Sequence, residues 1–135
     1  MEITIRHVGG VKFEASTRGH KIYSDQPASN GGTDSAFTPP ELLLAALGTC
    51  AGYYAVEYLR VRGLQYPDLK IRVTAEKATQ PARLAAFHIF ITTTGIPEAH
   101  QAGIARAVKA CLIHNTLVRP SSIELWVGEA EPLAA

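Results

Sequence analysis

An uncharged stretch of 15 residues, Leu42–Val56, constrains the fold more than any other part of this 135-residue chain. A helix needs about 20 apolar residues to span a bilayer, so the stretch predicts a buried helix and not a membrane anchor. The helix is expected to begin at the capping box Thr38-Pro39-Pro40-Glu41. It should run to Arg62, because glycine at position 63 is typical of the residue just past a helix end.

Gly48 and Gly52 flank Cys50 within this helix, although a helical glycine costs about 1 kcal/mol relative to alanine. At about 100° per residue, both glycines fall on one side of the helix, and Cys50 falls on the opposite side. Ala45 and Ala55 share the glycine side. We expect these small side chains to let another backbone approach closely, while Cys50 faces a different neighbour.

The remaining elements are predicted from the spacing of apolar residues, from turn residues and from stretches rich in β-branched and aromatic residues. Strands are expected at 3–5, 11–15, 20–25, 69–79, 84–94 and 122–127, with a hairpin turn at 9–10 and a long polar loop at 26–38. A second helix opens at Pro97-Glu98, and its apolar stripe through Ile104 and Val108 places Cys111 on the buried face near the helix end. The order β-β-β-α-β-β-α-β predicts an α+β fold with a mostly antiparallel sheet, in one domain spanning 1–135.

The charge of the chain is nearly balanced, with 13 basic and 12 acidic residues. The basic residues form neither a stripe nor a polybasic segment, so the charge pattern predicts neither nucleic acid nor a membrane surface as a partner. The first six residues carry charges where a signal peptide would be apolar, which favours a cytoplasmic location.

The chain has two cysteines, Cys50 and Cys111. Two are too few for a disulfide framework, and they lack the C-x-x-C spacing or histidine pair of a zinc site. Each could be a small buried side chain, since free cysteine is among the most buried residue types. His114, three residues after Cys111, could approach that sulfur, but a structural role is the simpler interpretation. The distance between the two thiols in the folded protein decides whether they are only packing residues or can form a redox pair.

Several segments together resemble one known family. They are Gly19-His20, Asp25, Gly31-Gly32, the run PPELLLAALGTCAGYYAVEYL at 39–59 and the run ARAVKACLIHNTL at 105–117. They resemble the OsmC/Ohr family (osmotically inducible protein C and organic hydroperoxide resistance protein) over nearly the whole chain. The most specific part is the helix motif P-E-L-L-L-A-A-L-G-x-C, followed 61 residues later by the second cysteine.

The resemblance implies an intertwined homodimer, in which a long central helix packs against an antiparallel sheet and two active sites lie near the subunit interface. In characterised members a peroxide oxidises the first cysteine to a sulfenic acid, and the second cysteine resolves it as a disulfide. By position these roles fall to Cys50 and Cys111. An external dithiol or lipoyl-type donor would then reduce the disulfide, with no bound cofactor or metal ion.

The family also indicates which groups should support the reactive thiol. A peroxidatic cysteine needs a nearby cation, and the middle of a helix gains little from the helix dipole. The dedicated hydroperoxidases place an arginine near the first hairpin, where this chain has Gly9-Gly10-Val11-Lys12, and a glutamate where it has Pro40. Arg18, at the next turn, is the nearest candidate for the cation. Glu41 lies one residue after the position that the family's glutamate occupies. The chain therefore resembles the OsmC-like branch more than the hydroperoxidases.

The leading hypothesis is thiol-dependent reduction of organic hydroperoxides, or a peroxide-responsive redox role, with Cys50 peroxidatic and Cys111 resolving. An alternative of another class is a non-enzymatic protein that binds a small apolar ligand at the dimer interface, because leucines and Tyr53-Tyr54 surround Cys50. A third possibility is a structural module whose cysteines only pack. Reactivity of the thiols toward peroxide separates the first hypothesis from the other two, and a stoichiometric small molecule found by native mass spectrometry separates the second from the third.

Overall fold

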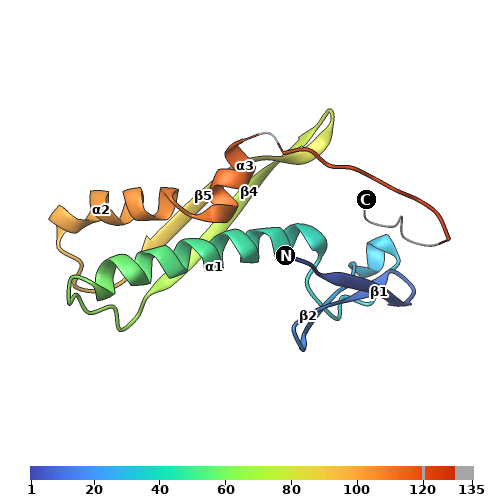
Figure 1. Ribbon diagram of the computed structural model, residues 1–135, viewed down its shortest axis with the longest axis horizontal. Helices are drawn as coiled ribbons and strands as arrows, with labels where there is room; N and C mark the ends of the chain where they lie inside the picture. The colour runs from blue at the N-terminus through green and yellow to red at the C-terminus, as the bar shows by residue number, and fades with distance from the viewer. Residues whose placement is uncertain (120, 130–135) are drawn as a thin grey trace.

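The computed structural model describes residues 1–119 and 121–129, which form two antiparallel sheets and three α-helices (Figure 1). The strands are β1 (Thr4–Gly9), β2 (Lys12–Thr17), β3 (His20–Ser24), β4 (Lys70–Thr79) and β5 (Ala82–Thr92), and the helices are α1 (Pro39–Arg60), α2 (Glu98–Lys109) and α3 (Leu112–Val118), with a 3-10 turn η1 at Ala28–Asn30. This arrangement confirms the predicted α+β class, the first five strands and the long first helix.

The three-stranded sheet β1-β2-β3 lies beside the N-terminal end of α1 (Figure 1). Its two turns use the left-handed backbone region, with φ of +53° at Gly10 and +48° at Arg18. Register places Ile5, Ala15 and Ile22 side by side across the three strands. Successive residues of a strand point to opposite faces, so this row forms an apolar face. Ile5 and Ile22 remain half exposed on it, at 56% and 50%.

Helix α1 begins where the capping box predicts. The backbone N–H of Thr38 donates a 2.7 Å hydrogen bond to the Glu41 carboxylate, and the Thr38 hydroxyl donates to the same oxygen at 2.9 Å. The helix ends at Arg60, two residues before the predicted end, and Gly63 follows with φ +65°. Both ends of α1 are therefore set by local residues.

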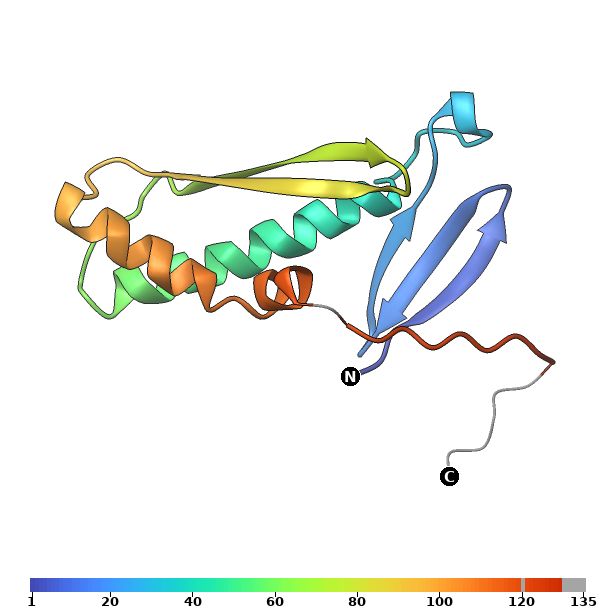
Figure 2. The same ribbon diagram turned by 90° about the horizontal axis from the view of Figure 1, so that it is seen from above.

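The core lies where α1 meets β4, β5 and α2. Its buried residues are Ala51, Ala55, Leu59, Ile104 and Val108. On the sheet side, a Cβ at Gly48 would come within 3.0 Å of Val73 Cγ2, and one at Gly52 within 2.7 Å of Ile71 Cδ1. The glycines thus let β4 approach α1, as predicted. Helices α1 and α2 both lie on one side of the β4-β5 hairpin (Figure 2), and α3 contacts α1.

The prediction that one helix carries Cys111 on its buried face is wrong. Helix α2 ends at Lys109, and Cys111 has non-helical backbone (φ −57°, ψ 132°) as the residue before α3. A straight continuation of α2 would follow the same axis, whereas the break lets α3 turn and contact α1. Neither glycine nor proline lies in the break, so tertiary packing sets it and the local sequence does not reveal it.

The predicted last strand at 122–127 is also absent from the part of the chain that the structure describes. These residues are extended but pair with no strand. Ile123, Leu125 and Val127 are 92%, 87% and 86% exposed. A strand requires a neighbouring strand for its backbone hydrogen bonds, and within one chain the segment has none.

Helix α1 alone among the described residues is long and apolar enough to cross a membrane, judged by length and composition only. Such a result is weak evidence, since the central helix of a folded domain passes the same test. Here α1 packs against β4, α2 and α3.

Candidate redox site

Cys50 and Cys111 are joined in a disulfide, with their Cα atoms 6.0 Å apart and a separation of 61 positions in sequence. This separation lies within the range that disulfide geometry requires. The bond connects the middle of α1 to the residue that precedes α3. Cys111 is fully buried, and Cys50 is partly buried. The structure therefore brings together the two residues that the sequence singled out.

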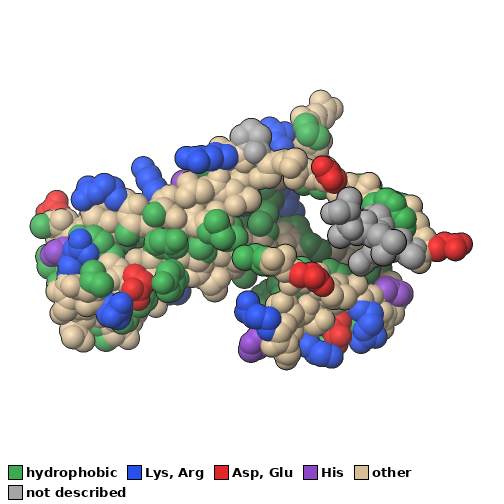
Figure 3. All heavy atoms as spheres, viewed as in Figure 1, with side chains coloured by type: hydrophobic (Ala, Val, Ile, Leu, Met, Phe, Trp, Pro, Cys, Tyr) green, Lys and Arg blue, Asp and Glu red, His purple; other side chains and the backbone are tan. Residues whose placement is uncertain are grey.

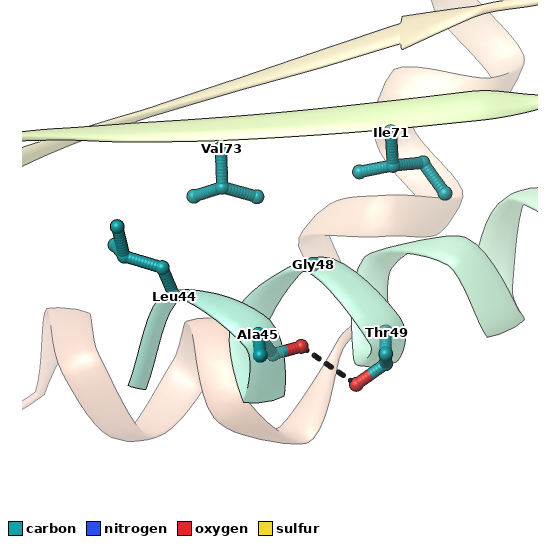
Figure 4. Close-up of a pocket in the computed structure, with 6 residues that line it drawn as sticks. All are labelled: Leu44, Ala45, Gly48, Thr49, Ile71 and Val73. Carbon is teal, nitrogen blue, oxygen red and sulfur yellow. Dashed lines mark hydrogen bonds between the residues drawn. The ribbon is translucent and has the colours of Figure 1, made fainter. Parts of the chain in front are cut away.

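The position of each sulfur follows from its element. Cys50 lies on the side of α1 opposite the glycines, so it faces away from β4 and toward α3. The glycine side carries a small apolar groove of 310 Å³ between α1 and β4, lined in part by Gly48 and Thr49 (Figure 4). The Thr49 hydroxyl donates a 2.8 Å hydrogen bond to the Ala45 carbonyl, so its hydrogen bond is made within the helix. The groove and the disulfide therefore occupy different faces of α1.

His114 lies in the first turn of α3, three residues after Cys111. Its Nδ1 is buried and has no hydrogen-bond partner among the described residues. A buried polar atom without a partner is uncommon in folded proteins. The sequence showed His114 near the second cysteine, but its unpaired nitrogen emerges only from the structure.

Arg18, the candidate cation, is exposed in the turn between β2 and β3. The strands of this sheet make their extensive contacts with one another and not with α1. Within a single chain Arg18 is therefore not brought to Cys50, and its role stays a prediction that requires a second chain. The Glu41 carboxylate accepts hydrogen bonds from Thr38 at the start of α1. This capping role explains a glutamate at position 41, so no catalytic role is needed to account for it.

The loop before α1 is organised by Asp25, which is only 2% exposed. Its carboxylate accepts hydrogen bonds from the hydroxyl and backbone N–H of Thr33, at 2.7 and 3.1 Å. The hydroxyl and backbone N–H of Ser35 donate to it at 2.8 and 3.1 Å, and the Gln26 N–H at 2.8 Å. The Thr33 hydroxyl, then the backbone N–H groups of Ser35 and Gln26, hold the pKa of Asp25 far below its usual range. Asp25 thus fixes the path of the chain into α1.

Residues 1–119 and 121–129 contain no group of three or more His, Cys, Asp or Glu side chains that could together hold a metal ion.

The model of the OsmC-like protein family matches residues 32–125, which include both cysteines and all of α1. The chain belongs to this family. Protein YhfA of Escherichia coli (strain K12) is 30% identical over 112 residues, which are 80% of this chain and 78% of YhfA. The match confirms the resemblance inferred from the sequence motifs.

Several solved structures share the fold. One from Psychrobacter arcticus 273-4 superposes with a TM-score of 0.78 at 22% identity, covering 84% of this chain and 85% of the other. An organic hydroperoxide resistance protein, OsmC, of Legionella pneumophila superposes with a TM-score of 0.61 at 19% identity, covering 87% and 89%. At these identities the likeness establishes the fold alone.

Proposed function

We propose that this OsmC-like protein reduces organic hydroperoxides through its two thiols, with Cys50 as the attacking and Cys111 as the resolving cysteine. The observation that carries the proposal is the disulfide between α1 and the start of α3. A resolving thiol within reach stops oxidation at the sulfenic acid, before irreversible products form. The partly buried Cys50 suits the attacking role, since the fully buried Cys111 is less accessible to a peroxide.

The proposed reaction has two steps in the protein. The Cys50 thiolate attacks one peroxide oxygen, the O–O bond breaks, and the alkoxide takes a proton and leaves as an alcohol. Cys50 is then a sulfenic acid. The Cys111 thiolate attacks that sulfur, the S–O bond breaks, and hydroxide takes a proton and leaves as water. A dithiol, of the lipoyl or a similar type, returns two electrons and two protons to restore both thiols.

The comparisons support a redox or stress-related role. The relative from Legionella pneumophila is named an organic hydroperoxide resistance protein. A related structure from Vibrio cholerae, with a TM-score of 0.56, carries a similar name and holds captopril in one of its active sites. Captopril is itself a thiol, so its presence there agrees with thiol chemistry as the activity proposed for this chain.

A homodimer in the cytoplasm is part of the proposal. Hydrophobic side chains reach the surface over α1 on the face turned away from β4 and β5 (Figure 3). The apolar face of the first sheet, with Ile5 and Ile22, is equally uncovered. If the first sheet of a second chain covers α1, its Arg18 comes from the partner and serves as the cation near Cys50. The unpaired segment 122–127 then also gains a strand to pair with.

Counting thiols tests the proposal. The reduced protein is mixed with one equivalent of cumene hydroperoxide, and free thiols and remaining peroxide are measured over time. Both thiols should disappear together as one peroxide is consumed. Cys50→Ser should abolish peroxide consumption, whereas Cys111→Ser should consume one peroxide and then accumulate a sulfenic acid that dimedone traps. If Cys50→Ser consumes peroxide as the wild type does, the proposal fails. Thiols inert to peroxide would instead favour the binding-protein alternative.

A further inference from the structure

A second cavity lies between β5 and α2, away from the groove of Figure 4. It measures 630 Å³, within the range of small-molecule sites. Seven of its twelve lining residues are apolar, among them Ile89 and Ile91 of β5 and Ile104 and Val108 of α2, and Thr92, Thr93 and Gln101 add polar groups. Ile89 and Ile91 also pack on the core cluster, so this wall is built on rigid elements. The cavity is therefore a preformed apolar groove.

The ionisable residues of this groove are both basic. They are Lys109, at the C-terminal end of α2, and His114 of α3, and no acidic side chain lines the groove. Lys109 is exposed, so its ammonium is free to move over the opening. His114 carries the buried Nδ1 without a partner among the described residues. Beside its apolar residues the groove thus carries two basic side chains, one of which has a buried nitrogen without a partner among the described residues.

We propose that this groove binds an amphipathic organic anion, an alkyl chain that ends in a carboxylate. The chain would lie along Ile89, Ile91 and Ile104, where it gains hydrophobic burial. The carboxylate would pair with the Lys109 ammonium and accept a hydrogen bond from the His114 ring. A half-turn of that ring about χ2 exchanges Nδ1 with Cδ2, so the unpaired nitrogen can occupy either edge of the ring.

This site differs from the proposed peroxide site in place and in chemistry. No bond to the ligand forms or breaks, and neither cysteine lines the groove. Binding can therefore be measured with the protein in its disulfide form, in which no free thiol reacts. The result is then independent of whether Cys50 reduces peroxides.

Calorimetric titration with octanoate tests the charged end. The oxidised protein should bind one octanoate per chain, and 1-octanol, which lacks the carboxylate, should bind more weakly. Lys109→Gln should weaken octanoate binding about three- to tenfold, in line with the strength of an ion pair near the surface. Arg106→Gln is the matched control, because Arg106 lies on the same turn of α2 but does not line the groove. Equal loss in both variants would overturn the role of Lys109.

A second pair of variants tests the position of the alkyl chain. Ala105 is exposed and lines the groove, and Ala102 is exposed on the same helix but does not. Ala105→Trp should fill the groove and abolish octanoate binding, and Ala102→Trp should bind as the wild type does, while circular dichroism checks that both stay folded. Undiminished binding in folded Ala105→Trp, or no octanoate binding by the wild type, would overturn the proposal.

Discussion

Cys50 on α1 and Cys111 before α3 are bonded across 61 residues, with their Cα atoms 6.0 Å apart. The bond ties the central helix to the point where the last two helices of the chain separate. A cross-link that closes a loop of this length stabilises a chain by about 4 kcal/mol, when estimated from the entropy of the unfolded state. Oxidation therefore changes the stability of the protein as well as the state of its thiols.

We expect reduction of this disulfide to lower the free energy of unfolding by as much as about 4 kcal/mol. Urea unfolding with and without a phosphine reductant measures the difference. The double variant Cys50→Ser/Cys111→Ser serves as the control, because its midpoint should not respond to the reductant. An identical wild-type midpoint under both conditions would contradict the expectation.

Gly52→Val should destabilise the protein by about 1–3 kcal/mol, because the new side chain meets Ile71 on β4. Ala46→Val, at an exposed position of the same helix, measures the cost of a β-branched residue alone, which is below about 1 kcal/mol. Adding Ile71→Ala to Gly52→Val should recover part of the loss if the contact is its cause. Urea denaturation of the wild type and the three variants provides the comparison, and a loss at Gly52 no larger than at Ala46 would speak against a close contact with β4.

Asp25→Asn should lower stability at neutral pH, since the amide cannot accept all the hydrogen bonds that the carboxylate receives from Thr33 and Ser35. The pKa of Asp25 is lowered in the folded protein, so its contribution is complete above the unfolded pKa, about 3.9, and is lost as the pH falls through the folded value. The wild type should therefore lose this contribution on acidification below about pH 4, and the variant should show a flatter profile.

Urea midpoints between pH 7 and pH 2 test the role of Asp25. Asp34→Asn is the matched control, because Asp34 lies in the same loop but is exposed. If both variants follow the wild-type curve, the buried carboxylate does not organise the loop.

Ile22→Asp should weaken the proposed homodimer about a hundredfold, because an unpaired carboxylate would be buried in the apolar face of the first sheet. Ser16→Asp places the same charge on the other face of that sheet, next to Lys21, and should leave association unchanged. Sedimentation velocity across a range of concentrations measures both. A wild-type protein that stays monomeric at high concentration would rule out this interface.

The elements that depend on close neighbours in the chain were predictable. Thr38 and Glu41 lie three residues apart and set the start of α1 through their own hydrogen bonds. The periodicity of the helix was enough to separate the glycine side from Cys50, because helical geometry alone fixes which residues share a face. Alternation of apolar residues likewise predicted β1, β2 and β4, whereas the turn at Arg18-Gly19 predicted β3 and the content of β-branched and aromatic residues predicted β5.

The site depended on contacts that no local pattern encodes. The break between Lys109 and Cys111 has neither glycine nor proline, and it forms because α3 packs back on α1. That break moves Cys111 out of a helix and brings it to Cys50. The segment 122–127 has the alternation of a strand but lacks a neighbour within one chain. The sequence by itself determined the faces of α1 and the candidate thiols, whereas tertiary packing decided that the two sulfurs meet, because that distance is set across 61 residues.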